Sequence, residues 1–130
     1  MEYPLDELID KASIIRLKFE RIPNLEDRTR WINEVSEYSI AIGEYIGREL
    51  CSRKEVRDWQ GRLYEINGKI WDLESDIRKG KENELGLEEV GKRAIAIRNL
   101  NGKRVGIKSE IVDKIGLGYK DIKINHASGN

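Results

Sequence analysis

The chain has 130 residues, which is enough for one domain with a single hydrophobic core. Charged residues make up 37% of it and hydrophobic residues 38%, a balance that favours long helices with solvated faces over a β-sandwich or a barrel. Because 24 basic residues offset 24 acidic ones, the formal net charge is +0, and general binding to nucleic acid is not expected.

The chain carries one cysteine, Cys51, and one histidine, His126. No disulfide can form within the chain, a His/Cys zinc site is not expected, and a reducing cytoplasm is the natural setting. Cys51 has no identifiable base beside it, so we expect a buried or inert thiol. No N-terminal apolar run has the form of a signal peptide, and none is long enough to span a bilayer, so we expect a cytoplasmic protein without membrane association.

The first predicted helix begins at Pro4, because proline fits the first turn of a helix. Asp6 and Glu7 follow near its positive end. The helix ends before Pro23, which lacks a backbone donor and restricts the residue before it. Its apolar residues recur at helical spacing: Leu5, Leu8, Ile9, Ala12, Ile15, Phe19 and Ile22.

The second predicted helix begins at Asn24, a residue suited to an N-cap, and ends near Cys51. Its apolar side comprises Trp31, Val35, Tyr38, Ile42, Tyr45, Ile46 and Leu50. The four residues from Ser52 to Glu55 have the form of a capping box, in which the Ser and Glu side chains satisfy reciprocal backbone donors. A third helix should therefore begin near Arg53 and run to about Lys79.

The third predicted helix carries two stripes of side chains. One is apolar and is expected to lie in the core: Val56, Trp59, Leu63, Ile66, Ile70, Leu73 and Ile77. The other is amphipathic and includes two large aromatics: Tyr64, Asn67, Trp71, Glu74 and Arg78. Residues 79–86 hold two glycines and no apolar period, which predicts a loop.

The fourth predicted helix runs from Leu87 to Gly116. Four amphipathic helices with short connections predict an all-α fold, an antiparallel four-helix bundle in which the long third and fourth helices form a hairpin. We expect residues 1–118 to form this one domain and residues 119–130 a short C-terminal tail that is extended or disordered. Apolar residues outside the main stripes predict a homo-oligomer: Ile14, Leu17, Ile40 and Ile95.

A polar interruption in the fourth helix is the most informative feature. Asn101, Arg104 and Lys108 occupy helical positions whose neighbours in the same stripe are apolar. Two interpretations stay open, because a charge in a dry core must be paired. The first is structural. The polar seam that Asn101, Arg104 and Lys108 form is exposed, or the carboxylates Asp72, Glu74 and Asp76 neutralise it through ion pairs.

The second interpretation is a pocket for an anionic small molecule, most simply a nucleotide or a sugar phosphate. In it, Arg104 and Lys108 contact phosphate, Tyr64 and Trp71 stack on a base or sugar face, and the two asparagines read polar edges. Lys11 of the first helix is a further candidate. It and the adjacent Asp10 point in different directions, so one of them should face another helix, where it could complete the polar seam, although pairing on the surface is favoured. The predicted ligand-binding residues are Tyr64, Asn67, Trp71, Asn101, Arg104, Lys108 and Lys11.

Carboxylates suggest two other sites. The run Asp72, Glu74 and Asp76, with Glu65 upstream, has the chemistry of a divalent-cation site, but one helix does not converge its carboxylates and a solvated face is favoured. A second pattern is similar to the ExxE…ExxD arrangement with which all-α NTP pyrophosphohydrolases hold magnesium. It comprises Glu34, Glu37, Glu55 and Asp58. It implies a Mg²⁺-dependent enzyme as an alternative; otherwise no cofactor is expected.

Three segments together resemble a family of small helical proteins of unestablished function carried by bacteria and phages. They begin with ELIDK at residues 7–11, continue with Asn67 and the WDLESDIR run at 71–78, and end with Asn101, Arg104 and Lys108. The resemblance implies a helical fold and an intracellular role. Our leading hypothesis is a non-catalytic binding protein, in one version a phage protein that sequesters a nucleotide signal; the alternatives are the pyrophosphohydrolase and a structural or adaptor bundle that binds a protein.

Overall fold

The computed structural model describes the backbone of residues 4–84 and 86–115, and the side chains of 4–78 and 86–115. This part of the chain forms four helices and no strand: α1 (Leu5–Arg21), α2 (Leu25–Gly47), α3 (Arg53–Glu84) and α4 (Leu87–Ile115). The all-α fold class is confirmed. The predicted tail at 119–130, with His126, lies outside the described residues. No helix within them has both the length and the apolar character that a bilayer crossing requires.

Two helix starts follow from side-chain caps that the sequence predicts. The Asn24 side chain accepts hydrogen bonds from the backbone N–H groups of Glu26 and Asp27, at 3.0 and 3.4 Å. At the start of α3, the Ser52 N–H donates to Glu55 Oε1 at 2.9 Å, and the Glu55 N–H donates to Ser52 Oγ at 3.1 Å. These reciprocal bonds confirm the predicted capping box.

The third helix is longer than predicted. It continues through residues 79–84, which we expected to begin a loop, and ends at Glu84. The segment contains no proline, and a single glycine inside a helix costs only about 1 kcal/mol. Its Lys and Glu residues are good helix formers, so Gly80 alone does not stop the helix.

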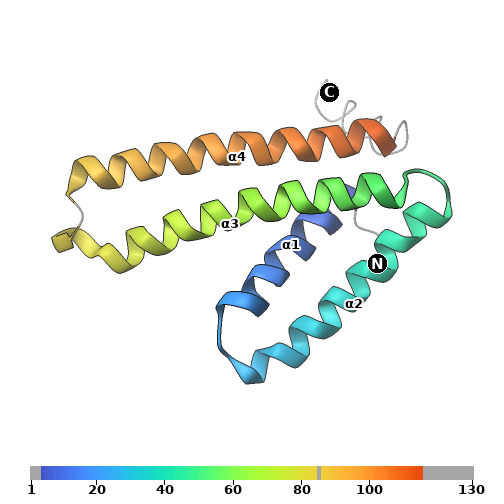
Figure 1. The fold of residues 1–130 in the computed structure, drawn as a ribbon, viewed down its shortest axis with the longest axis horizontal. Coiled ribbons are helices and arrows are strands. Elements are labelled where there is room, and N and C mark those ends of the chain that lie inside the picture. Colours follow the sequence, from blue (N-terminus) through green and yellow to red (C-terminus); the bar gives the residue numbers. More distant parts are fainter. Residues whose placement is uncertain (1–3, 85, 116–130) are drawn as a thin grey trace, which may run out of the picture.

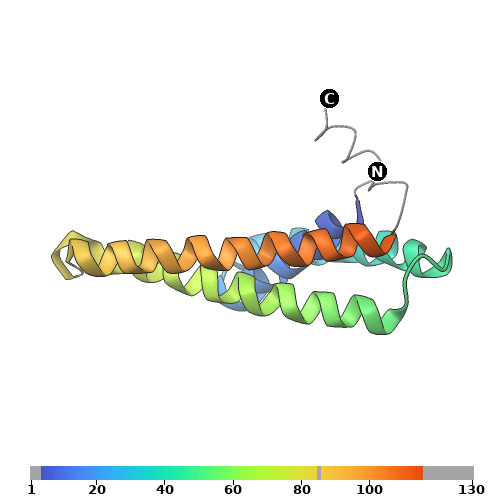
Figure 2. The same cartoon turned by 90° about the horizontal axis from the view of Figure 1, so that it is seen from above.

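The two long helices lie side by side, and α1 and α2 diverge from one half of this pair (Figures 1 and 2). Ion pairs link α3 to α4 along its length: Glu55 with Lys114 at 3.3 Å, Arg62 with Glu110 at 2.6 Å, and Asp76 with Arg93 at 2.9 Å. The short α1 packs against each of the other three helices, whereas α2 packs mainly on α1. The packing centre is therefore α1.

The hydrophobic core lies where α1 meets the other helices. Its buried members are Leu5, Leu8, Ile9, Ile42, Tyr45, Cys51, Val56, Trp59, Leu63, Ile107 and Ile111. Of the apolar stripe predicted on α3, the part up to Ile70 contributes most, and Leu73 and Ile77 are only half-buried. The reason is visible in Figure 1: the far half of the α3–α4 pair projects beyond α1 and α2.

Candidate functional site

The polar seam predicted between the long helices is closed by Asp10 of α1. This aspartate is 1% exposed. The Arg104 guanidinium binds it through two bonds, Nε donating to Oδ1 at 3.0 Å and Nη2 donating to Oδ2. The Asn67 amide also donates to Oδ1, at 2.9 Å, and to Ser13 Oγ at 2.8 Å. Lys108 Nζ donates to Glu7 Oε1 at 2.7 Å and lies 3.9 Å from Asp10 Oδ2.

The charges of this cluster balance. Burial raises the pKa of Asp10, but the hydrogen bonds from Arg104 and Asn67 and the charges of Arg104 and Lys108 outweigh it and hold the pKa below its ordinary value. The hydrogen bond to Asp10 in turn raises the pKa of Arg104. Both cations of the seam are thus neutralised by carboxylates within the protein.

The structure brings together only some of the predicted ligand-binding residues. Asn67, Arg104 and Lys108 meet around Asp10, as the structural interpretation requires, but their partners are Asp10 and Glu7 and not the predicted carboxylates of α3. The expectation that Asp10 pairs on the surface is wrong. Of the others, Trp71, Asn101 and Lys11 are half-buried, and Tyr64 lines a different site.

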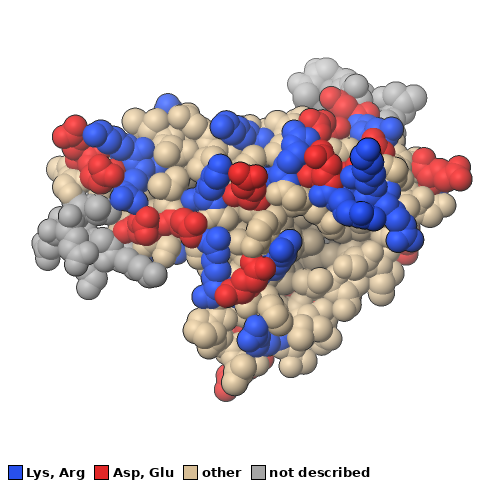
Figure 3. Space-filling view, viewed as in Figure 1, with Lys and Arg blue, Asp and Glu red and all other residues tan. Residues whose placement is uncertain are grey.

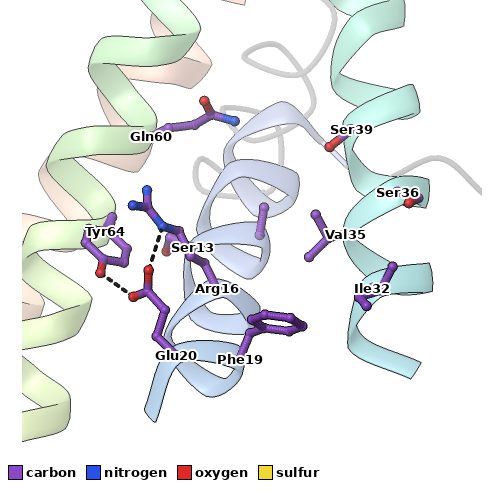
Figure 4. Close-up of a pocket in the computed structure, with 11 residues that line it drawn as sticks. Ser13, Arg16, Phe19, Glu20, Ile32, Val35, Ser36, Ser39, Gln60 and Tyr64 are labelled. Carbon is purple, nitrogen blue, oxygen red and sulfur yellow. Dashed lines mark hydrogen bonds and ion pairs between the residues drawn. The ribbon is translucent and has the colours of Figure 1, made fainter. Parts of the chain in front are cut away.

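That different site is a cleft between α1, α2 and α3, of about 430 Å³. Figure 4 shows Phe19 of α1 facing Ile32 and Val35 of α2, with Tyr64 and Gln60 of α3 forming another wall. Its lining residues are Ala12, Ser13, Arg16, Phe19, Glu20, Ile32, Val35, Ser36, Ser39, Gln60 and Tyr64. Most of the surface that these residues expose to the cleft is apolar, and polar groups are contributed by all three helices.

Small side chains keep the cleft open. Ser36 and Ser39 of α2 and Ala12 of α1 are too short to fill the space that these diverging helices leave beside α3. Ser39 and Gln60 also line a second recess, of about 320 Å³, which contains Gly43 and Gly47 as well. The two hollows share a border, so the open space follows α2 for several turns.

One cluster of polar side chains lies at the mouth of the cleft. Tyr64 Oη donates a hydrogen bond to Glu20 Oε1, and Arg16 Nε donates to Glu20 Oε2 at 3.2 Å (Figure 4). The Arg16 guanidinium also lies over the Tyr64 ring, 4.0 Å from its centre. The bond from Tyr64 lowers the pKa of Glu20, and the same bond raises the pKa of Tyr64.

The α2 side of the cleft carries little charge. In Figure 3 both signs are interspersed along α3 and α4, whereas the part over α2 is largely uncharged. The exposed residues on this side of α2 include Ile32, Ser36, Ser39, Ile40 and Gly43. A solvated helix usually carries charges on its exposed face, so this side of α2 is unusual in a chain with 37% charged residues.

The predicted metal sites find no support in the described part of the chain, where no three His, Cys, Asp or Glu side chains are grouped closely enough to hold a metal ion. Glu55 pairs with Lys114 and Asp58 with Arg62. The acidic run of α3 forms ion pairs one by one: Glu65 with Lys69, Asp72 with Arg21, Glu74 with Arg78, and Asp76 with Arg93. This is the solvated face that the sequence favoured.

Cys51 is buried in the core, as expected. Burial raises the pKa of its thiol, and the negative charge of Glu55 raises it further. The thiol is therefore held in its unreactive protonated form.

The sequence interpretation did not assign Asp10, Arg16 or Glu20 to a site. One signal pointed to Asp10: Asp6, Asp10, Ser13 and Leu17 share one line of α1 at helical spacing, and all four are buried. Arg16 and Glu20 give no comparable signal, because an i,i+4 ion pair is ordinary on a helix surface.

Comparison of the chain with models of protein families, with curated proteins and with solved structures finds no match. The resemblance to small helical proteins of bacteria and phages therefore stays a prediction.

Proposed function

We propose that this protein is a non-catalytic binding protein and that its ligand is a small anionic molecule with an apolar body. The observation that supports the proposal is the cleft between α1, α2 and α3. Its volume of about 430 Å³ falls within the range of small-molecule pockets, roughly 300–1,000 Å³, and its apolar walls with a few polar groups are typical of such sites. In this proposal the bundle is antiparallel, and the α3–α4 hairpin supports one wall of the cleft.

The seam is the less favourable place for the ligand. A phosphate that bound Arg104 there would have to displace Asp10, which is 1% exposed and would lose the cation that neutralises it. Removing one partner of a buried ion pair typically costs about 3–5 kcal/mol. The ligand is therefore assigned to the cleft, where Tyr64 remains a ligand-binding residue and Arg16 replaces Arg104 as the cation.

The charge of the cleft narrows the ligand class. Arg16 is the one cationic residue among the described residues that line it, and Glu20 beside it carries the opposite charge. A carboxylate or a phosphate monoester fits this balance better than a triphosphate does. Sequestration of a nucleotide signal is a version of the proposal in which the base occupies the apolar part.

Ligand screening with a filled-cleft variant tests the proposal. Nucleoside monophosphates, sugar phosphates and aromatic carboxylates are screened by thermal shift and by protein-observed NMR. Ser36→Trp places a large ring in the cleft, and Ser109→Trp, at an exposed serine of α4 outside it, is the matched control. We expect ligands whose binding is lost in the first variant and kept in the second. The proposal is contradicted if the screen finds no ligand, or if both variants lose ligand binding equally.

A second candidate function, a structural bundle that assembles with a second copy, is favoured by the uncharged side of α2. Leu25, Ile32 and Ile40 on this helix are 79%, 52% and 68% exposed. Exposed aliphatic residues gathered on one face are typical of interaction surfaces. Sedimentation velocity should then show a dimer that Ile40→Glu disrupts, while Val105→Glu, at an exposed position of α4, leaves it intact. A monomer at every concentration excludes this candidate.

A further inference from the structure

The mouth of the cleft already contains an anion that belongs to the protein itself. The Glu20 carboxylate receives one hydrogen bond from Arg16, on its own helix, and one from Tyr64, on α3. Both oxygens are thus bound by donors that point toward one place at the entrance (Figure 4). This arrangement of a guanidinium and a phenol is a ready-made binding site for any carboxylate or phosphate oxygen.

We infer that Arg16 and Tyr64 form the anion subsite of the cleft and that Glu20 occupies it until a ligand anion displaces it. The inference rests on the proposed function and makes it more specific, since it assigns the ligand's charged group to the mouth and its apolar body to the interior. The ligand is then an amphiphile with one anionic group, a carboxylate or a phosphate monoester, on an aromatic or aliphatic body.

Glu20 is able to leave the subsite, unlike Asp10 in the seam. Its side chain is 39% exposed, and it lies in the last turn of α1, next to the final residue Arg21. An exposed i,i+4 ion pair contributes little to stability, so turning the Glu20 side chain into solvent is inexpensive. Asp10, with a side chain only 2% exposed, has no such route to water.

Arg16 is held in position for an incoming anion. Its guanidinium lies over the Tyr64 ring, 4.0 Å from the ring centre, and this stacking fixes the plane of the donors without using them. The Tyr64 hydroxyl lies beside the same carboxylate. When Glu20 turns away, both donors keep their direction and need a new acceptor, which the ligand supplies.

Removing the charge of Glu20 without changing its shape tests the inference. In Glu20→Gln the internal anion is gone, whereas Arg16 and Tyr64 remain. Two probes share one apolar body and differ in charge, naphthalene-2-carboxylate and naphthalene-2-carboxamide, and their Kd values are measured by NMR titration of the full chain. We expect the carboxylate to bind about tenfold tighter to the variant than to the wild type, and the carboxamide to bind equally to both. Naphthyl phosphate as a third probe distinguishes a phosphate from a carboxylate ligand.

Three further variants separate a subsite from general electrostatics. Glu65→Gln changes the net charge equally, at an exposed i,i+4 ion pair of α3 outside the cleft, and should leave all Kd values unchanged. Arg16→Gln should abolish the preference for the carboxylate, and Tyr64→Phe should reduce it severalfold.

The outcomes distinguish the inference from the proposed function. If Glu20→Gln tightens both naphthalene probes equally, or if Glu65→Gln has the same effect, the cleft binds ligands but the subsite does not exist. An unchanged Kd for the carboxylate in Glu20→Gln overturns the inference in the same way. If none of the probes binds any variant, the proposed function fails and the subsite fails with it.

Discussion

Replacing Arg104 with methionine removes the cation that neutralises Asp10 while it keeps most of the length of the side chain. Asp10 then loses both hydrogen bonds from the guanidinium and keeps the one from Asn67 at 2.9 Å, with Lys108 Nζ 3.9 Å away. Breaking a buried ion pair typically costs 3–5 kcal/mol. Because Lys108 stays close and the Arg104 side chain is 31% exposed, we expect the low end, a loss of about 3 kcal/mol.

Denaturant unfolding followed by circular dichroism measures this loss, and Tm should fall by about 10 °C. The matched control is Arg62→Met. The Arg62 guanidinium also binds a carboxylate on another helix, Glu110, but this pair is exposed and should contribute less than about 1 kcal/mol. The double variant Asp10→Leu/Arg104→Met should recover most of the stability, since it leaves no unpaired charge. If Arg104→Met lowers the free energy of unfolding no more than Arg62→Met does, the ion pair of Arg104 with Asp10 is no more important than an exposed one, and the prediction is wrong.

The pH dependence of the same variant gives an independent check. In the wild type the pKa of Asp10 lies below its ordinary value of 3.8, so Asp10 contributes stability above that pH, and the contribution is lost as pH falls through the lowered pKa. Without Arg104, burial should raise the pKa of Asp10 above 3.8. The variant then gains stability as pH falls from 7 toward 4, and its deficit relative to the wild type should shrink. If the stability deficit of the variant stays constant or grows as pH falls from 7 toward 4, the predicted rise in the pKa of Asp10 is wrong.

Four further substitutions test three local features, each by denaturant unfolding. Gly102→Ala should stabilise the protein by about 0.5–1 kcal/mol, because a Cβ at this position meets nothing within 4 Å. Gly68→Ala should stabilise it less, since the added Cβ would lie 3.3 Å from the Arg21 side chain. Equal effects of the two substitutions would contradict the packing at Gly68. Glu49→Gly should stabilise by up to about 1 kcal/mol, since Glu49 has a φ of 61°, and a loss of stability would show that this conformation is not strained. Trp59→Phe should destabilise by about 1–2 kcal/mol through the lost 3.0 Å hydrogen bond to Glu110 and the smaller ring, and a neutral result would rule out that bond as a contributor.

The local features of the fold were predictable from the sequence, and the pairing of distant residues was not. The caps at Asn24 and Ser52 depend on residues within one turn, so their sequence patterns were sufficient. Asn67 and Arg104 were recognised as polar interruptions of apolar stripes, and they lie in one cluster. Their shared partner was not assigned, because Asp10 and the adjacent Lys11 point in different directions and only tertiary packing shows which of them faces inward.

The cleft was beyond prediction for a related reason. Tyr64 and Asn67 are three residues apart on α3, and both were assigned to one site. In the structure α1 crosses this stripe, so that Asn67 faces the seam with Arg104 while Tyr64 faces Glu20 at the cleft. The space itself depends on how far α2 diverges from α3, which side-chain periodicity does not encode.

The contacts that seal the seam join residues 94 and 101 positions apart in the chain, Asp10 with Arg104 and Glu7 with Lys108. At a synthesis rate of about 5–20 residues per second, the ribosome adds Arg104 roughly 5–20 seconds after Asp10. During this interval α2 and α3 are available to pack against α1, but Asp10 lacks its counter-charge and α4 does not yet cover α1. A chain truncated before Arg104 would retain an aspartate that cannot be buried without cost. We therefore expect α1 to complete its packing only after α4 has been synthesised, and incomplete chains to remain open to proteases.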